Sequence, residues 1–252
     1  MGVLNVTPDS FSDGGRWTDP EQAVAHGLRM AAEGADVVDV GGESTRPGAE
    51  PVEESEERRR VLEVVSALAP TVRVSIDTRT PAVAEAALEA GATLLNDVSA
   101  SLWPAAAAAG AGWVAMHMRG EPRTMQVEPW YDDVVADVGS FLVERAERAR
   151  AAGVEQVWID PGIGFGKTLE HNLSLLRRLG DLVCTGWPVL VGASRKGFLG
   201  ALLGGAPPDD RLEGSLAVAV WAAMSGVAMV RVHDVAATVQ ALRLVGDAAP
   251  AA

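Results

Sequence analysis

The chain has 252 residues, 48% hydrophobic and 22% charged, so it is long enough for one large α/β barrel or two small domains. Its formal net charge of −13 argues against a nucleic-acid or anionic-membrane surface. A single cysteine, Cys184, excludes an intramolecular disulfide framework. No basic-then-apolar leader opens the chain, so we expect a cytoplasmic protein.

Short β-branched runs alternate with Ala-, Leu- and Glu-rich amphipathic segments along the whole sequence. The runs predict strands at 2–5, 37–40, 72–77, 93–97, 113–117, 157–160, 189–192 and 229–232. The segments between them predict helices at 20–33, 53–68, 81–90, 132–152, 169–179, 211–224 and 236–245, with a shorter one at 105–109. The uncharged stretch 214–230 is too short for a membrane span and predicts a buried helix followed by a strand.

Proline and glycine mark the ends of these helices. Pro20 and Pro81 each follow a polar residue and occupy the first helical position, where a missing N–H costs nothing. Glycines follow four of the predicted helices and favour left-handed caps, at Gly34, Gly91, Gly153 and Gly226.

Eight strand–helix units in a chain of this length predict a single (β/α)8 TIM barrel of the α/β class. A doubly wound sheet is the structural rival, but it has no need of eight such units. No linker or shift in composition divides the chain, so we take residues 1–252 as one domain. The long connections follow the first, second, fifth and seventh strands, at the end of a barrel that carries active sites.

Polar residues end nearly every predicted strand. Taken singly, each has an ordinary structural explanation as a turn, a cap or a satisfied core group. Together they would lie on one rim of the barrel, where an apolar interior gives them no common structural task, so they predict a functional site. They are Asn5, Asp77, Asn96, Asp97, His117, Asp160, Ser194, Arg231 and His233.

Asp77, Asn96 and Asp160 supply acceptors and an amide donor at the floor of this site. Such a set suits a flat heterocycle with an amidine-like N–H edge, which a carboxylate can bind through two parallel hydrogen bonds. Ser194-Arg195-Lys196 and Arg231-Val232-His233 follow the seventh and eighth strands and bring cationic groups together. Because these two loops commonly bind phosphate in such barrels, they predict an anion site.

The stretch 158–168 ends in Gly166-Lys167-Thr168 and superficially resembles a phosphate-binding P-loop. A P-loop needs glycine where this chain has Pro161, and the dinucleotide pattern fails at Lys167. We therefore assign the function of this stretch to Asp160 and expect Lys167-Thr168 only to begin the next helix.

Two polar, glycine-containing loops follow the first and second predicted strands. The loop at 5–15 is interpreted as a mobile lid, and Asn5 at its base offers a carboxamide oxygen to Mg²⁺. The loop at 42–48 has the same character. No His/Cys spacing supports zinc, and no Ser-His-Asp arrangement can be argued, so the chemistry requires no protein nucleophile.

These motifs resemble those of the dihydropteroate synthase family. The resemblance runs through Leu4-Asn5-Val6-Thr7-Pro8-Asp9-Ser10-Phe11-Ser12-Asp13-Gly14-Gly15 and Gly42-Glu43-Ser44-Thr45-Arg46-Pro47-Gly48. It continues, in the family's order, through Asp77-Thr78, Asn96-Asp97-Val98, Met116-His117-Met118, Asp160-Pro161-Gly162-Ile163-Gly164-Phe165, Ser194-Arg195-Lys196 and Arg231-Val232-His233-Asp234.

The resemblance implies a reaction and a set of roles. The reaction joins (7,8-dihydropterin-6-yl)methyl diphosphate to 4-aminobenzoate, giving 7,8-dihydropteroate and diphosphate in folate synthesis, in a family that sulfonamides target. Substrate binding is implied for Thr45, Asp77, Asn96, Asp160, Lys196, Arg231, Val232 and His233, and for the aminobenzoate pocket at Phe11, Ser12, Pro47, Phe165 and Ser194. Catalytic roles are implied for Asp13, Lys196, Arg231 and His233, a Mg²⁺ ligand at Asn5, and a homodimer.

The sequence departs from the family pattern at two places. The N-terminal hairpin usual in the family is missing or reduced, because Met1 stands directly before the first strand. Ala100-Ser101 replaces the usual glycines after Asn96-Asp97-Val98-Ser99, which predicts a stiffer loop.

Two alternatives remain open at this point. The pterin-binding module of corrinoid-dependent methyltransferases shares the barrel and a similar Asp/Asn floor, although it needs neither the lid nor the diphosphate groups. A paralogue that binds the pterin but has lost turnover would show the same residues.

Overall fold

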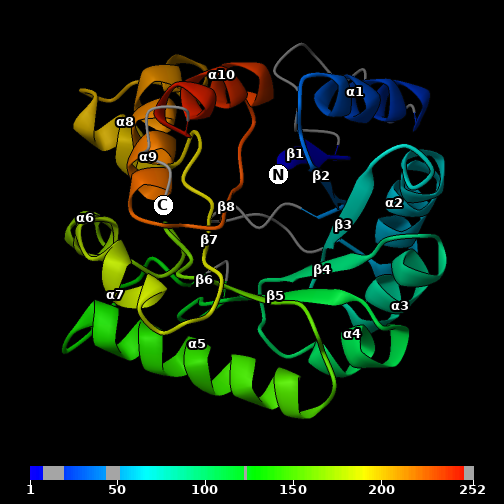
Figure 1. Ribbon diagram of the computed structural model, residues 1–252, viewed down its shortest axis with the longest axis horizontal. Coiled ribbons are helices and arrows are strands. Elements are labelled where there is room, and N and C mark those ends of the chain that lie inside the picture. The colour runs from blue at the N-terminus through cyan, green and yellow to red at the C-terminus, as the bar shows by residue number, and fades with distance from the viewer. Residues whose placement is uncertain (8–19, 44–51, 122–123, 247–252) are drawn as a thin grey trace.

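The computed structural model describes residues 1–7, 20–43, 52–121 and 124–246. Within these residues it contains eight short parallel strands, each followed by helical segments (Figure 1). The strands are β1 (Gly2–Asn5), β2 (Val37–Gly41), β3 (Arg73–Asp77), β4 (Leu94–Asp97), β5 (Gly112–Met116), β6 (Val157–Asp160), β7 (Leu190–Val191) and β8 (Met229–Val230). All eight predicted strands are therefore present, the last two shorter than expected.

Helices surround the strands. They are α1 (Pro20–Ala32), α2 (Glu54–Leu68), α3 (Pro81–Glu89), α4 (Trp103–Ala109), α5 (Val134–Ala151), α6 (Leu169–Arg177), α7 (Leu179–Val183), α8 (Gly197–Leu202), α9 (Leu212–Met224) and α10 (Val235–Gly246). Two of these, α7 and α8, were not predicted as separate helices. A short 3₁₀ turn, Pro208–Asp210, precedes α9.

Local chemistry explains the helix ends. Asp133 caps α5, its Oδ1 accepting hydrogen bonds from the backbone N–H of Val135 at 2.9 Å and of Ala136 at 3.2 Å. Thr168 caps α6 in a capping box with His171. The predicted glycine caps all have positive φ, for example +102° at Gly34, which explains the choice of glycine there.

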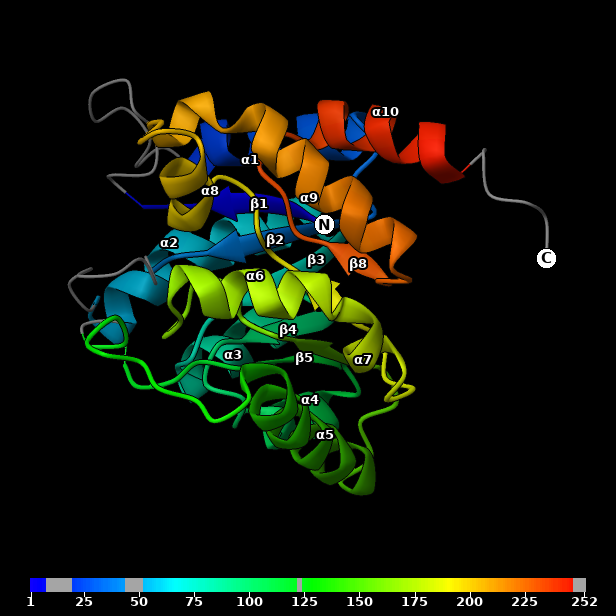
Figure 2. The same cartoon turned by 90° about the vertical axis from the view of Figure 1, so that its left-hand side faces the viewer.

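The strands close into a barrel. Hydrogen bonds join them in the order β1-β2-β3-β4-β5-β6 and, separately, β7-β8. Parallel bridges between Ile159 and Val189 and between Gly2 and Val232 connect these two sheets on both sides. The strands point the same way, toward the left in Figure 2, so their carboxyl ends form one rim.

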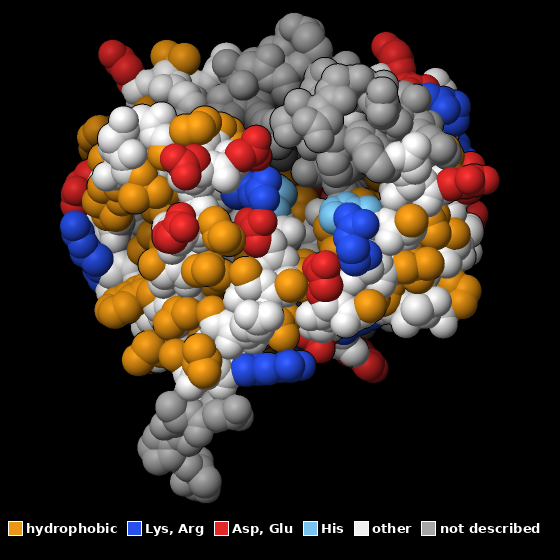
Figure 3. Space-filling view, turned by 90° about the horizontal axis from the view of Figure 1, so that it is seen from above, with side chains coloured by type: hydrophobic (Ala, Val, Ile, Leu, Met, Phe, Trp, Pro, Cys, Tyr) orange, Lys and Arg blue, Asp and Glu red, His pale blue; other side chains and the backbone are white. Residues whose placement is uncertain are grey.

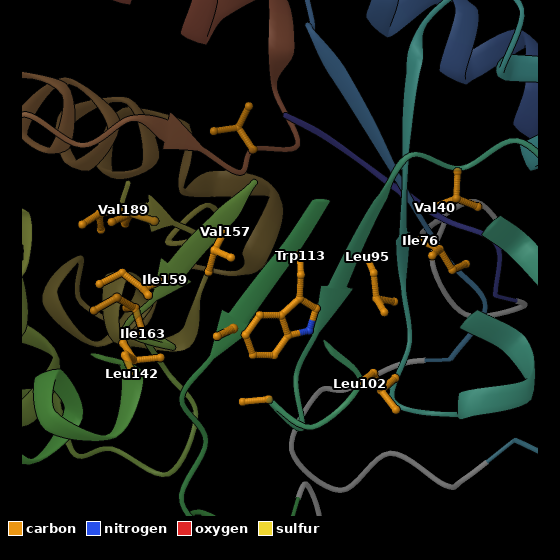
Figure 4. Close-up of a cluster of buried hydrophobic side chains, with 14 of the residues drawn as sticks. Val40, Ile76, Leu95, Leu102, Trp113, Leu142, Val157, Ile159, Ile163 and Val189 are labelled. Atoms are coloured by element: carbon orange, nitrogen blue, oxygen red, sulfur yellow. The ribbon is translucent and has the colours of Figure 1, made fainter. Parts of the chain in front are cut away.

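The sheet separates two hydrophobic cores. The smaller core fills the barrel interior with Met1, Val37, Leu94, Val114 and Leu190. The larger core lies between the strands and the helices, and Figure 4 shows part of it around Trp113, Leu95 and Ile159. Because side chains alternate along a strand, one set of positions faces the interior and the next faces the helices.

Helix α9 corrects one expectation. The sequence predicted a buried helix, but α9 exposes 51% of Trp221 and 73% of Met224. The helix carries one charged residue, Glu213, so it has apolar side chains on the face turned away from the barrel as well as on the face packed against it. No helix in the described part of the chain is long and apolar enough to cross a membrane.

Candidate active site at the carboxyl rim of the barrel

Register places the predicted floor residues side by side. Asn5 pairs with Gly41, Gly41 with Asp77, and Asp77 with Asn96, so all four lie at one level of the sheet and on its inner face. On the other side of the barrel Asp160 pairs with Met116 at the end of β6. The structure therefore brings Asp77, Asn96 and Asp160 to one rim, as the sequence predicted.

Asp39 joins this group, although the sequence patterns did not predict it as a site residue. It lies on β2, fully buried, and its Oδ2 accepts hydrogen bonds from Asn96 Nδ2 at 2.9 Å and Arg231 Nε at 2.6 Å. Arg231 also donates from Nη2 to Asp77 Oδ2 at 2.7 Å. A charged residue within the apolar run Val37-Val38-Asp39-Val40 was the sequence signal that could have identified it.

Oxygen acceptors remain open in this network. Among the described residues, Asp39 Oδ1 and Asp77 Oδ1 are buried without a hydrogen-bond partner. Buried carboxylate oxygens without partners are rare in native proteins, and at a rim of this kind they indicate a site that receives donors from a ligand.

The loop after β6 builds the opposite wall. Asp160 Oδ1 accepts a 2.7 Å hydrogen bond from the backbone N–H of Gly162. Gly162 has φ +63°, and a Cβ there would lie 1.9 Å from the carbonyl oxygen of His117, so only glycine fits. The ammonium of Lys196 donates to the carbonyl of Ile163 and lies 4.1 Å from the centroid of the Phe165 ring. Lys196, Phe165 and Asp160 therefore share one wall.

Lys167 corrects a further expectation. It does not simply begin the next helix, because its side chain is buried with an exposed fraction of 3%. Its Nζ lies 3.0 Å from Nδ1 of His117 and donates to the carbonyl oxygens of His117 at 3.3 Å and Phe165 at 3.0 Å. Lys167 thus fastens the loop after β6 to the end of β5.

The electrostatics of the site reflect burial. Burial raises the pKa of Asp77 to about 7, although the Arg231 guanidinium opposes the shift, and burial also raises the pKa of Asp160. Burial lowers the pKa of Lys196 to about 8. Burial works against the charge of Arg231, but Asp39 and Asp77 outweigh it and raise the pKa of the guanidinium.

Burial and neighbouring charges also shift the pKa values of Lys167 and His117, behind the loop after β6. Burial lowers the pKa of Lys167 to about 7. Burial and the neighbouring Lys167 ammonium lower the pKa of His117 to about 3. A neutral imidazole is the form that can accept a hydrogen bond at Nδ1, so the two shifts agree with the observed contact.

The segments after β7 and β8 lie together, as predicted, but Arg195 makes different contacts from Ser194 and His233. Ser194 Oγ lies 3.0 Å from His233 Nδ1 and also accepts from the backbone N–H of His233 at 3.2 Å. Arg195, which the sequence placed in the anion site, is held instead by Asp234, with Nη2 at 2.6 Å and Nε at 3.0 Å from the carboxylate. It also lies 3.2 Å from Asp209, so its guanidinium binds loop residues rather than the barrel mouth.

The side chain of Val232 faces away from the mouth. It belongs to the core between strands and helices, and its backbone bonds to Met1 and Val3 of the first strand. Five predicted site residues, Phe11, Ser12, Asp13, Thr45 and Pro47, lie outside the described residues.

The described residues offer few side chains that could bind a metal ion. They contain no group of three His, Cys, Asp or Glu side chains that could hold an ion. Asn5 ends β1 at the rim, with its Oδ1 3.7 Å from where a Cβ on Gly41 would stand. A single amide oxygen fits Mg²⁺, which retains several waters and is commonly held in part by substrate phosphate oxygens.

Comparison with known proteins agrees with this geometry. Residues 1–233 match the family of pterin binding enzymes. The chain is 51% identical to the dihydropteroate synthase of Mycobacterium leprae, over 98% of this chain and 92% of that protein.

Solved structures show the same likeness. The Yersinia pestis dihydropteroate synthase, in a sulfonamide drug complex, superposes with a TM-score of 0.93 at 47% identity, covering 98% of this chain and 93% of that one. The Xanthomonas albilineans dihydropteroate synthase with 4-aminobenzoic acid gives 0.91 at 49% identity, covering 99% and 93%. The barrel, the rim residues and the similarity to these relatives show that the chain belongs to the dihydropteroate synthase family of pterin-binding transferases.

Proposed function

We propose that the chain joins (7,8-dihydropterin-6-yl)methyl diphosphate to 4-aminobenzoate, with Asp77, Asn96, Asp160, Lys196 and Arg231 binding the pterin substrate. The observation that carries this assignment is that carboxylate oxygens without hydrogen-bond partners and two cations, Lys196 and Arg231, lie together at one barrel mouth. Acceptors suit the N–H edge of a pterin, and cations suit a diphosphate.

Asp160 is the proposed anchor of the pterin. Its Oδ1 is held by Gly162, while Oδ2 makes no hydrogen bond to a described residue and lies 3.9 Å from where a Cβ on Gly192 would stand. Asp77 Oδ1 and the amide of Asn96 offer further polar contacts from the opposite wall. Because these groups are fixed by the sheet, they hold the pterin ring in one orientation.

Arg231, His233 and Lys196 are the proposed partners of the leaving diphosphate. When the bond between the pterin methylene and the diphosphate oxygen breaks, the electron pair leaves with the oxygen. Fixed cations stabilise that developing charge. Asn5 would hold Mg²⁺ beside the diphosphate, and the ion would add Lewis-acid stabilisation of the same oxygens.

The second substrate is proposed to enter against Phe165 and Ser194. The neutral aniline nitrogen of 4-aminobenzoate forms the new bond to the methylene carbon and then loses a proton, which the released diphosphate can accept. No covalent intermediate with the protein is needed. The roles of Asp13, Thr45, Phe11, Ser12 and Pro47 in this step rest on the family resemblance alone.

The apolar outer face of α8, α9 and α10 favours a homodimer. Hydrophobic side chains gather over α8 and α9 in Figure 3. The exposed ones include Leu202 on α8, Trp221 and Met224 on α9, and, on α10, Leu244. Exposed apolar patches of this kind are common at protein interfaces. The exposed free thiol of Cys184 fits a reducing cytoplasm.

A direct assay tests the proposal. Purified protein with Mg²⁺ and both substrates should release diphosphate and form dihydropteroate in equal amounts, and omission of 4-aminobenzoate should abolish product. Lys196→Met is the matched inactive control, because it removes the cation while keeping the length of the side chain. Tight binding of the pterin diphosphate without any product would overturn the assignment and favour a paralogue without turnover.

A further inference from the structure

Asp39 lies deeper in the barrel than the residues of the rim. Register pairs Asp39 with Ser75, and pairs Asp77 with Gly41, which is two residues further along β2. Two residues along a strand rise about 6.6 Å, so Asp39 forms a floor beneath the level of Asp77 and Asn96. Its side chain has no exposed surface, whereas 12% of the Asp77 side chain and 19% of the Arg231 side chain are exposed.

One oxygen of Asp39 holds two side chains that face the mouth. Oδ2 accepts from Asn96 Nδ2 at 2.9 Å and from Arg231 Nε at 2.6 Å. These contacts connect β2 with β4 on one side and with the end of β8 on the other. A single buried carboxylate therefore links the two walls of the site.

The first contact determines which way the Asn96 amide faces. A carboxylate only accepts hydrogen bonds, so the group next to Asp39 must be the NH₂ of Asn96 and not its oxygen. Oδ1 of Asn96 is then turned away from Asp39. Without the carboxylate, nothing in this contact would prevent the amide from rotating by half a turn and exchanging its donor and acceptor.

The second contact determines where the Arg231 guanidinium lies. Asp39 holds Nε and Asp77 holds Nη2, so the planar fork is fixed at two points. Among the described residues, no hydrogen bond engages Nη1 of Arg231. The guanidinium is therefore held by one edge while the Nη1 group stays available to an anion.

We propose that Asp39 is a positioning residue that acts through Asn96 and Arg231, setting the acceptor orientation of the first and the anion-binding geometry of the second. The proposal rests on the proposed function, because it assigns Asn96 to the pterin and Arg231 to the diphosphate. Asp39 reaches these two side chains through Oδ2, while its Oδ1 has no hydrogen-bond partner among the described residues.

The substitution Asp39→Asn keeps the shape of the side chain and removes its charge. We expect the parent protein to bind inorganic diphosphate and the pterin alcohol that lacks the diphosphate, and the variant to bind each at least about tenfold more weakly. Asp97→Asn is the matched control. The sequence placed Asp97 with the rim residues, but the structure turns it away from the site: it follows Asn96 on β4, so its side chain lies on the opposite, helix-facing side of the strand. There it is an equally buried carboxylate that accepts from Trp113 Nε1 and from the backbone N–H groups of Ser101 and Leu102 in the loop after β4. The control should lower the unfolding temperature and leave both affinities unchanged.

A double-mutant cycle separates positioning from a direct role. If Asp39 acts on diphosphate through Arg231, Asp39→Asn combined with Arg231→Gln should bind diphosphate no more weakly than Arg231→Gln alone. Additive losses, or unchanged binding of both probes in Asp39→Asn, would overturn the proposal.

Two further measurements test the positioning role separately from the proposed function. The coupling of Asp39 and Arg231 in the free energy of unfolding is measured on the protein without substrates, and a value of zero would also contradict the proposal. If the parent protein formed no dihydropteroate but the variants still lost diphosphate affinity, the proposed function would fail while the positioning role stood.

Discussion

Replacing Asp160 with asparagine exchanges one carboxylate oxygen for an NH₂ group, and the structure decides which one. The Gly162 N–H donates to Oδ1 at 2.7 Å, so the remaining oxygen of the asparagine must stay there to accept it. The NH₂ group then replaces Oδ2 and faces the mouth of the barrel. A pterin N–H edge would meet a donor where the parent protein offers an acceptor.

The size of the effect follows from two losses. A hydrogen bond to a charged group contributes about 1.5–3 kcal/mol, and leaving a buried donor unpaired costs about 1–3 kcal/mol. Together these give roughly 2.5–6 kcal/mol, which corresponds to pterin binding about 70-fold to 25,000-fold weaker. Stability should not fall, because burial raises the pKa of Asp160 and thus disfavours its charged form in the folded protein.

Titration calorimetry of the pterin diphosphate with Mg²⁺ measures the loss, and urea unfolding of both proteins checks that the fold is intact. Glutamine at the same place is a useful companion, since its longer side chain cannot keep both the Gly162 contact and the position of the amide. If Asp160→Asn bound the pterin diphosphate as tightly as the parent, the assignment of Asp160 as the anchor would be refuted.

Three further predictions concern the surroundings of the site. His117→Gln should remove a pH dependence of stability. In the unfolded chain His117 binds a proton below its ordinary pKa of 6.5, whereas in the folded protein it binds one only near pH 3. As the pH falls below 6.5, the free energy of unfolding of the parent, measured in urea titrations, should therefore fall by up to about 1.4 kcal/mol per pH unit relative to the variant. Gly162→Ala should lower the free energy of unfolding by at least about 2 kcal/mol, because it adds strain at φ +63° and a contact of 1.9 Å; an unchanged urea midpoint would contradict this. Arg195→Met should lower the unfolding temperature by breaking the contact with Asp234 but leave diphosphate affinity within about twofold, and a larger loss in calorimetry would return Arg195 to the anion site.

Alternation of strand and helix patterns was enough to predict the barrel, because every unit carries its own signal. Val37, Val38 and Val40 favour a strand wherever they lie, and Pro81 and Gly91 mark the ends of α3 without help from distant residues. The rim residues Asp77, Asn96 and Asp160 were also predictable, since the end of a strand is a local property and all parallel strands of a barrel end on one side.

Contacts between distant segments could not be predicted in this way. Lys167 looked like the start of a helix, and its burial depends on carbonyl groups of His117 and Phe165 that the fold brings to it. Arg195 looked like part of an anion site, and only the arrangement of the loops after β7 and β8 places Asp234 within 2.6 Å of its guanidinium.

Asp39 shows both what the sequence determines and what depends on the tertiary structure. The sequence determined that a carboxylate stands in the middle of a buried strand. The tertiary structure decided that it faces the barrel interior and meets Asn96, 57 positions away, and Arg231, 192 positions away. Side-chain propensity acts over a few residues, whereas the direction and partners of a buried charge depend on strand register and barrel closure, which exist only in the folded chain.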